Sequence, residues 1–147
     1  MRYTCKVEIN LPIDKVVELW SDENNFKEWQ SGFQSITLLE GEAETKGAKS
    51  KIVLQQGKMR LELLETILVS DLPNEKTAIY EHIHMTNTQT SQFKALTENK
   101  TEYISEVEYT QFNGFLPKVM SILFPGKFKK QSKKWMVQFK NFAESTT

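Results

Sequence analysis

Residues 115–144 read FLPKVMSILFPGKFKKQSKKWMVQFKNFAE, a run in which apolar and basic side chains alternate at helical spacing. The apolar positions fall on one face of a helix: Leu116, Val119, Met120, Leu123, Phe128, Trp135, Met136, Phe139 and Phe142. Pro125-Gly126 interrupts the pattern, because proline disfavours helical geometry in the residue before it. We therefore expect a long amphipathic helix at about 115–144 with a break at Pro125-Gly126.

The residues before this helix predict the surface that buries its apolar face. Seven segments alternate or are rich in β-formers and are separated by turn-like pairs such as Glu40-Gly41, Gln56-Gly57 and Thr86-Asn87: 3–9, 33–41, 47–55, 58–70, 77–86, 89–98 and 101–112. Most gaps are too short for crossover helices, so neighbouring strands should pair antiparallel as a meander. Between the first two strands, the spacing of Ile13, Val16, Trp20 and Trp29 predicts two short helices.

These elements predict an α+β fold in which a curved seven-stranded antiparallel sheet wraps around the long C-terminal helix. The chain of 147 residues has no low-complexity run or linker, so we expect one domain spanning 1–147. Strands that splay away from a helix leave a cleft between sheet and helix, which would be lined by alternate strand residues and by the helix stripe.

Charge and composition narrow the classes of partner. The chain has 19 basic and 19 acidic residues, yet residues 113–147 carry seven lysines against Glu144 alone. The simplest interpretation is a solvated helix face, with a weak contact to an anionic surface or protein through Lys130, Lys133 and Lys134 as the alternative. The absence of arginine from this segment disfavours nucleic acid.

The sequence also bears on the localisation and the redox chemistry of the protein. No window is apolar enough for membrane insertion, and the N-terminus alternates like a strand, so we expect a cytoplasmic protein. Cys5 is the only cysteine, which excludes an intramolecular disulfide and a thiolate metal cluster. We expect neither a cofactor nor a bound metal.

The alternation of the strands predicts the lining of the cleft. The expected ligand-binding residues are largely aromatic, aliphatic or methionine: Phe33, Leu61, Leu63, Phe93, Val107, Tyr109, Val119, Met120, Leu123, Phe128, Trp135 and Met136. Such walls suit a flat or flexible hydrophobic ligand, although many of these residues must simply fill the core. Trp20, Trp29 and Trp135 are more simply explained as structural anchors.

Candidate acid–base residues are few. Tyr80, His82 and His84 alternate within the predicted strand 77–86 and would share one face. Histidine titrates near neutral pH, but two ordinary exposed histidines are the simpler interpretation, and no further cluster completes a zinc site. Glu65 interrupts the apolar rank Leu61, Leu63, Ile67 and is either a perturbed cavity carboxylate or, more simply, a solvent-facing or lysine-paired one.

The order of these elements resembles the START-like superfamily, which includes polyketide cyclases, lipid-transfer domains, birch-pollen-type allergens and activators of the Hsp90 ATPase. The matching pieces span nearly the whole chain: Pro12 to Val17, Leu19-Trp20-Ser21-Asp22, Trp29, Glu40-Gly41, Lys46-Gly47, Glu65-Thr66-Ile67, Leu72-Pro73 and the C-terminal helix. The resemblance implies a helix-grip fold with a cavity, whereas its members range from enzymes to carriers to regulators.

Three functions follow as hypotheses. The first is noncatalytic binding of a small hydrophobic molecule, a lipid or an aromatic metabolite, in the cavity between sheet and helix. The second is a cyclase- or dehydratase-like enzyme in which Tyr80, His82, His84 or Glu65 supplies acid and base in the same cavity. The third is a co-chaperone-like protein-binding module that uses the lysine face of the helix.

Overall fold

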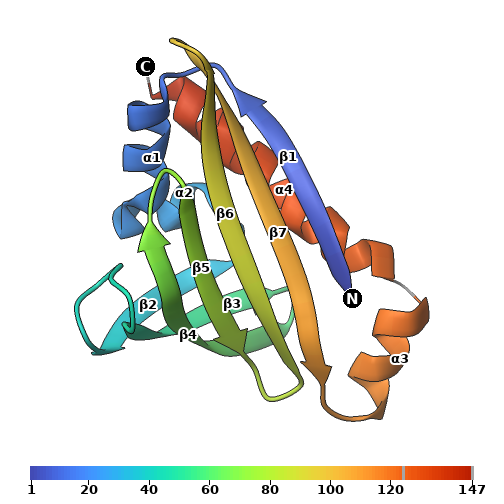
Figure 1. The fold of residues 1–147 in the computed structure, drawn as a ribbon. Helices are drawn as coiled ribbons and strands as arrows, with labels where there is room; N and C mark the ends of the chain where they lie inside the picture. Colours follow the sequence, from blue (N-terminus) through green and yellow to red (C-terminus); the bar gives the residue numbers. More distant parts are fainter. Residues whose placement is uncertain (124, 147) are drawn as a thin grey trace.

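A seven-stranded antiparallel sheet curves around a C-terminal helix (Figure 1). The computed structural model describes residues 1–123 and 125–146, with the side chains of all of these except Ser121, Leu123 and Pro125. The strands are β1 (Arg2–Ile9), β2 (Phe33–Glu40), β3 (Lys49–Gln56), β4 (Met59–Asp71), β5 (Glu75–Glu81), β6 (Met85–Thr97) and β7 (Lys100–Phe112). The helices are α1 (Ile13–Ser21), η1 (Glu23–Asn25), α2 (Phe26–Trp29), α3 (Phe115–Leu123) and α4 (Pro125–Ser145).

The strand order is β1-β7-β6-β5-β4-β3-β2, and every neighbouring pair is antiparallel. Strands β2 to β7 form the predicted meander, in which each strand pairs with the next one along the chain. Strand β1 pairs instead with β7, with Tyr3 opposite Val107 and Ile9 opposite Thr101. The first and last strands are therefore neighbours, and α4, which follows β7, crosses the concave side of the sheet (Figure 1).

The connection between β5 and β6 differs from the prediction. We expected a strand over 77–86 and a turn at Thr86-Asn87, but β5 ends at Glu81. His82 and Met85 exchange backbone hydrogen bonds of 2.8 and 3.2 Å and close a tight turn with Ile83 at its tip. At Thr86 and Asn87 the chain makes a register shift against β7 instead of a turn. Asparagine and threonine are compatible with either structure, which explains the error.

The predicted break in the C-terminal helix is confirmed. Helix α3 ends at Leu123 and α4 begins at Pro125, so the proline is the first residue of the second helix. Proline suits that position because the first amide of a helix has no intrahelical partner and the ring already fixes a helical φ. We expected the break at Pro125-Gly126 itself, but both residues belong to α4. Residue 124, between the two helices, lies outside the described residues.

The core lies where α1, α2 and the second half of α4 meet the sheet. Helix α4 contributes Met136, Phe139 and Ala143, whose side chains are almost completely buried. The ring of Phe139 packs edge-to-face on Trp29 at 5.2 Å between centroids. Several of these core residues, among them Trp29 and Met136, also border a cavity between the sheet and α4. None of the described helices is long and apolar enough to cross a lipid bilayer.

Candidate functional site

A cavity of about 380 Å³ lies between the concave face of the sheet and α4. Strands β3 to β7 form its floor, α4 its roof, and residues of α1, α2 and α3 its sides. Its position results from the alternation of the strands: every second residue of β4, namely Leu61, Leu63 and Glu65, faces α4. The predicted cavity between sheet and helix is therefore present.

Apolar and aromatic side chains make up much of the wall. The aromatic ones are Trp20, Phe26, Trp29, Tyr80, Tyr103, Tyr109, Phe128 and Trp135. The aliphatic and methionine ones are Ile52, Leu54, Leu61, Leu63, Met85, Met120 and Met136. The remaining lining residues are polar: Gln30, Gln56, Glu65, Lys76, His82, Asn87, Gln89, Ser105, Lys127, Gln131 and Ser132.

The structure places seven of the twelve expected ligand-binding residues in this wall: Leu61, Leu63, Tyr109, Met120, Phe128, Trp135 and Met136. Four others lie outside it: Phe33, Phe93, Val107 and Val119. Phe93 is covered by Tyr103, whose ring stacks on it at 4.8 Å, and Val107 is completely buried. Phe33 packs edge-to-face on Phe26, and Val119 is half-buried on α3. The Leu123 side chain lies outside the described residues.

All three tryptophans, which we expected to be structural anchors, also line the cavity. Trp20 is held by a hydrogen bond of 3.1 Å from its indole nitrogen to the Tyr103 hydroxyl, and its ring stacks on Trp29 at 6.3 Å. On the opposite side, the Trp135 indole donates to the carbonyl and the hydroxyl of Ser31. These bonds fix the ring planes, so the aromatic part of the wall is preformed.

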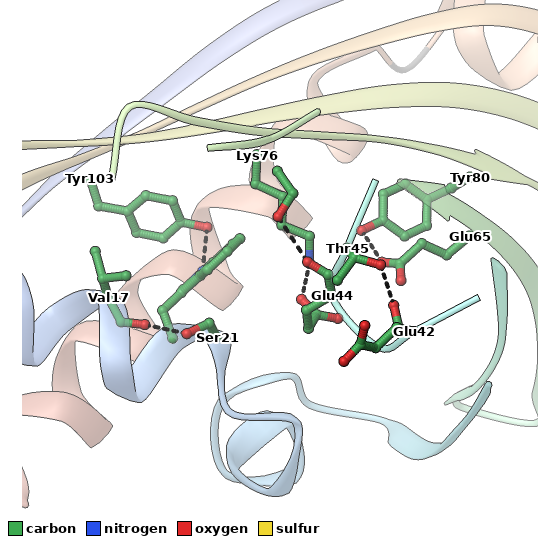
Figure 2. A network of polar contacts seen from close by, with 11 residues as sticks. Val17, Ser21, Glu42, Glu44, Thr45, Glu65, Lys76, Tyr80 and Tyr103 are labelled. Carbon is green, nitrogen blue, oxygen red and sulfur yellow. Dashed lines mark hydrogen bonds and ion pairs between the residues drawn. The ribbon is translucent and has the colours of Figure 1, made fainter. Parts of the chain in front are cut away.

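Glu65 and Tyr80 are the central polar pair of the cavity. They lie directly opposite each other on β4 and β5, and the Tyr80 hydroxyl donates to Glu65 Oε2 at 2.7 Å (Figure 2). Only 3% of Glu65 is exposed. Burial raises the pKa of Glu65, and the nearby Lys76 charge and the Tyr80 hydrogen bond offset this only in part. Burial and the Glu65 charge together raise the pKa of Tyr80 well above its usual value, so this hydroxyl keeps its proton.

This arrangement corrects the simpler interpretation of Glu65, which placed it in solvent or in a lysine pair. A register shift does occur on β4, but it lies between Ile67 and Val69, beyond Glu65. The alternation therefore holds through Leu61, Leu63, Glu65 and Ile67, and the carboxyl points inward. The Lys76 charge lowers the pKa of Glu65, but its ammonium group forms an ion pair with a different carboxylate, that of Glu44.

Lys76 is a residue of the cavity wall that sequence reasoning missed. It lies on β5 on the same face as Ala78 and Tyr80 and is 7% exposed. Its ammonium group contacts Glu44 Oε1 at 2.6 Å and lies 5.3 Å from the centre of the Trp20 ring. The predicted strand began at residue 77 and therefore did not include Lys76. A start at Glu75 would have placed Lys76 in the inward rank.

Glu44 reaches Lys76 from the loop between β2 and β3 (Figure 2). Its φ of 61° lies in the left-handed region, and Ser70 donates to its carbonyl at 2.8 Å. The Glu44 carboxyl also interacts with Glu23 of η1. Burial, the hydrogen bond to Glu44 and the Glu44 charge together raise the pKa of Glu23 to about 7. The three segments β2–β3, β5 and η1 are thus joined by one charged cluster.

The two histidines do not form the expected rank on a strand. His82 lies after the end of β5 and lines the cavity, whereas His84 is exposed in the turn. The His84 amide donates to His82 Nδ1 at 3.2 Å, and burial and the nearby His84 lower the pKa of His82. Of the four acid–base candidates, Glu65, Tyr80 and His82 therefore share the cavity and His84 does not. Among the described residues, no three histidine, cysteine or acidic side chains are grouped to hold a metal ion.

No family model and no curated protein matches this chain. Solved structures do resemble it along nearly its whole length. TTHA0849 from Thermus thermophilus superimposes with a TM-score of 0.81 at 14% identity, over 100% of this chain and 99% of that one. The Zhui aromatase/cyclase from Streptomyces sp. R1128 gives 0.81 at 10% identity, over 98% and 93%.

A START superfamily protein from Mycobacterium smegmatis gives a TM-score of 0.78 at 11% identity, over 99% of both chains. These similarities and the observed topology define the fold: the chain has the START-like helix-grip architecture, as the sequence predicted. At such low identity the comparisons establish the fold alone. The function must be argued from the cavity itself.

Proposed function

We propose that this protein binds a small, largely hydrophobic molecule, a lipid or an aromatic metabolite, between its sheet and α4. The observation that carries the proposal is the cavity of about 380 Å³ with its aromatic and aliphatic wall. Ligand pockets are typically about 300–1,000 Å³, mostly apolar, with a few placed polar groups. A well-packed core has few voids larger than a water molecule, so a space of this size inside a small fold requires an explanation.

The wall favours a ligand with a flat part. Aromatic rings approach from both sides of the cavity, Trp135 and Phe128 from α4 and Tyr103 and Tyr109 from β7. Tyr109 and Phe128 already pack edge-to-face across the gap at 4.9 Å. Rings of this kind bind planar molecules by stacking and edge contacts, each adding roughly 0.5–1.5 kcal/mol beyond area burial. Met85, Met120 and Met136 can adjust around the rest of the molecule.

The test uses a neutral aromatic dye and a blocked cavity. We expect N-phenyl-1-naphthylamine to bind with a blue-shifted, enhanced emission that saturates at one dye per chain. Leu63→Trp fills the cavity from β4 and should weaken dye binding at least about tenfold, since the added ring takes the place of most contacts that the dye makes. Glu62→Trp, on the opposite and exposed face of the same strand, is the matched control and should bind normally.

Thermal unfolding of both tryptophan variants shows whether the fold is intact. Saturable dye binding that Leu63→Trp leaves unchanged would place the dye elsewhere and contradict the proposal. Native mass spectrometry of protein purified from its own host supplies a second readout, and protein that is consistently empty would count against a resident ligand.

One observation favours an enzyme as the second candidate: Glu65 and Tyr80 meet inside the cavity, with His82 on the same wall. A buried carboxyl with a raised pKa can exchange a proton with a bound carbonyl compound, as a cyclase or dehydratase requires. The simplest probe is 2-tetralone, an aromatic ketone with exchangeable α-protons. We expect the protein to accelerate their exchange with deuterium oxide and Glu65→Gln to abolish this effect. Exchange at the uncatalysed rate with saturating protein would exclude this candidate.

A further inference from the structure

Acidic side chains outnumber basic ones in the part of the cavity around Lys76. Glu23, Glu44 and Glu65 face a single lysine, Lys76. The Lys76 ammonium group already has two partners, the Glu44 carboxylate at 2.6 Å and the face of the Trp20 ring at 5.3 Å. Its side chain is 9% exposed and that of Glu44 24%, so this ion pair is shielded from solvent and holds its geometry. The lysine charge is therefore neutralised by Glu44.

Glu23 does not add a full negative charge near neutral pH. Burial and the neighbouring Glu44 carboxyl raise the pKa of Glu23 to about 7, so this carboxyl is partly protonated near neutral pH. Like charges so close together cannot both be retained at low cost. With the proton on Glu23, the group formed by Glu23, Glu44 and Lys76 is close to neutral. Glu65 is then the carboxyl that lacks a cation.

Glu65 is also the only acidic side chain in the cavity wall within the described part of the chain. Tyr80 donates to Oε2, and no other described residue donates a hydrogen bond to this carboxyl. A phenol hydrogen bond solvates a carboxylate but does not neutralise it. A carboxylate that is 97% buried without a cation is costly, so it either takes up a proton or gains from a cation brought into the cavity.

The other titratable groups of the wall do not supply this cation. Lys127 borders the cavity from α4 with an exposed side chain, where water and salt screen its charge. The lowered pKa of His82 favours its neutral imidazole. The positive charge that would complement Glu65 must therefore come from the ligand.

We propose that the cavity takes an aromatic or aliphatic amine, whose ammonium group pairs with Glu65 while its apolar body lies among the tryptophan and tyrosine rings. This inference rests on the proposed ligand-binding function and adds the chemical class of the ligand. Tyr103 and Trp20 stand next to the cluster, and aromatic faces attract a desolvated cation. A ligand carboxylate is disfavoured, because it would be repelled by the like charge of Glu65.

Three probes with the same naphthalene ring differ only in their polar group. Comparing them separates the contribution of the polar group to binding from that of the apolar body. They are 2-naphthylmethylamine, 2-naphthalenemethanol and 2-naphthoate, titrated by calorimetry at pH 7. We expect the amine to bind at least about tenfold more tightly than the alcohol, and the carboxylate more weakly than both. An alcohol or carboxylate that binds as tightly as the amine would overturn the inference while leaving the proposed function standing. Failure of all three probes and of the neutral dye would contradict the proposed function itself.

A variant pair assigns the preference to Glu65. In Glu65→Gln the amide oxygen can still accept the Tyr80 hydrogen bond, so the change removes the charge at nearly constant shape. We expect the amine and the alcohol then to bind within about threefold of each other. Glu81→Gln, at the exposed end of β5, is the control and should keep the full preference. A preference that survives Glu65→Gln would contradict the role of this carboxyl.

A measurement on the unaltered protein guards against a variant that does not fold. Because the pKa of Glu65 is raised, part of this group is protonated in mildly acidic solution, and pairing with an ammonium group should expel that proton. Calorimetry of amine binding in buffers of different ionisation enthalpy should therefore show proton release, and binding of the alcohol should not. Equal proton release for both probes would contradict the inference.

Discussion

Tyr80 and Glu65 occupy directly opposed positions on β5 and β4, and the tyrosine hydroxyl donates to the buried carboxyl at 2.7 Å. The pair belongs to the polar part of the cavity wall, and Lys76 lies further along β5. The strand register alone brings the two side chains together, because opposed residues of an antiparallel pair project from the same face.

We predict that Tyr80→Phe destabilises the fold by about 1–2 kcal/mol, because the carboxyl loses its described donor. The loss should appear in urea unfolding and should shrink when Glu65→Gln is already present, since the two residues act as a pair. Equal losses in both backgrounds would mean that the hydrogen bond is not the cause.

Glu23 should make stability depend on pH. Its pKa rises from 4.5 to about 7 on folding, so the protonated carboxyl is favoured in the folded state. The stabilisation is complete below about pH 4.5 and is lost as the pH rises through about 7. The glutamine of Glu23→Gln cannot ionise. At pH 8.5 the melting temperature of this variant should therefore exceed that of the parent protein by about 2–4 °C, allowing for solvent screening of this half-exposed group.

Below pH 4.5 the melting temperatures of the parent protein and Glu23→Gln should converge. Glu28→Gln, at an exposed position of α2, is the control and should follow the parent protein throughout. A Glu23→Gln variant that parallels the parent protein from pH 4 to 9 would show that the contact with Glu44 does not control this titration.

Phe139 should be among the most costly side chains to truncate. It is completely buried on α4, and its ring contacts those of Trp29 and Tyr103 edge-to-face at 5.2 and 6.0 Å. Phe139→Ala should lower the free energy of unfolding by about 3–5 kcal/mol, through lost burial and the cavity left behind. Val137→Ala, two residues away and 39% exposed, should cost well under about 1 kcal/mol in the same urea titration.

Gly32 and Gly47 offer a matched test of backbone space. Both have left-handed φ angles, 91° and 88°, so alanine is strained at either position. A Cβ at Gly32 would lie 2.3 Å from the Gln55 carbonyl oxygen, whereas nothing lies within 4 Å at Gly47. We expect Gly47→Ala to cost about 1 kcal/mol and Gly32→Ala clearly more, because β2 must move away from β3. Equal melting temperatures for the two variants would contradict this assignment.

The lysine face of α4 should be independent of the cavity. Lys130, Lys133 and Lys134 border a hollow on the outer side of the helix, together with Val137 and Gln138. Reversing the three lysines to glutamate should leave dye binding unchanged and abolish any salt-sensitive retention on heparin, a polyanion. Retention that survives the triple reversal would place an anionic contact elsewhere on the protein.

Much of the fold was predictable because it depends on local periodicity. The apolar stripe of 115–144 predicts the C-terminal helix, and Pro125-Gly126 predicts a break in it. The alternation of apolar residues predicts the strands, and their short connections require an antiparallel meander. The errors lie in the connections. The β5–β6 turn was placed at Thr86-Asn87 when it lies at 82–84, and that shift removed His84 from the expected inward rank.

The cavity wall was less predictable than the fold. Alternation identified Leu61, Leu63 and Tyr109 correctly as wall residues, but it equally suggested Val107 and Phe93, which lie buried in the core. Periodicity shows which face of a strand points inward. It does not show whether another side chain fills the space above that face, because this depends on how far α4 stands from each strand.

By itself, the sequence determined that a curved sheet grips an amphipathic helix, since apolar spacing and chain connectivity leave few other ways to bury the stripe of α4. Only the tertiary structure decided the chemistry of the cavity. Glu23, Glu44, Glu65 and Lys76 come from four separate segments, and their protonation depends on distances and burial that no local pattern encodes. The raised pKa of the buried Glu65 carboxyl is a consequence of that meeting.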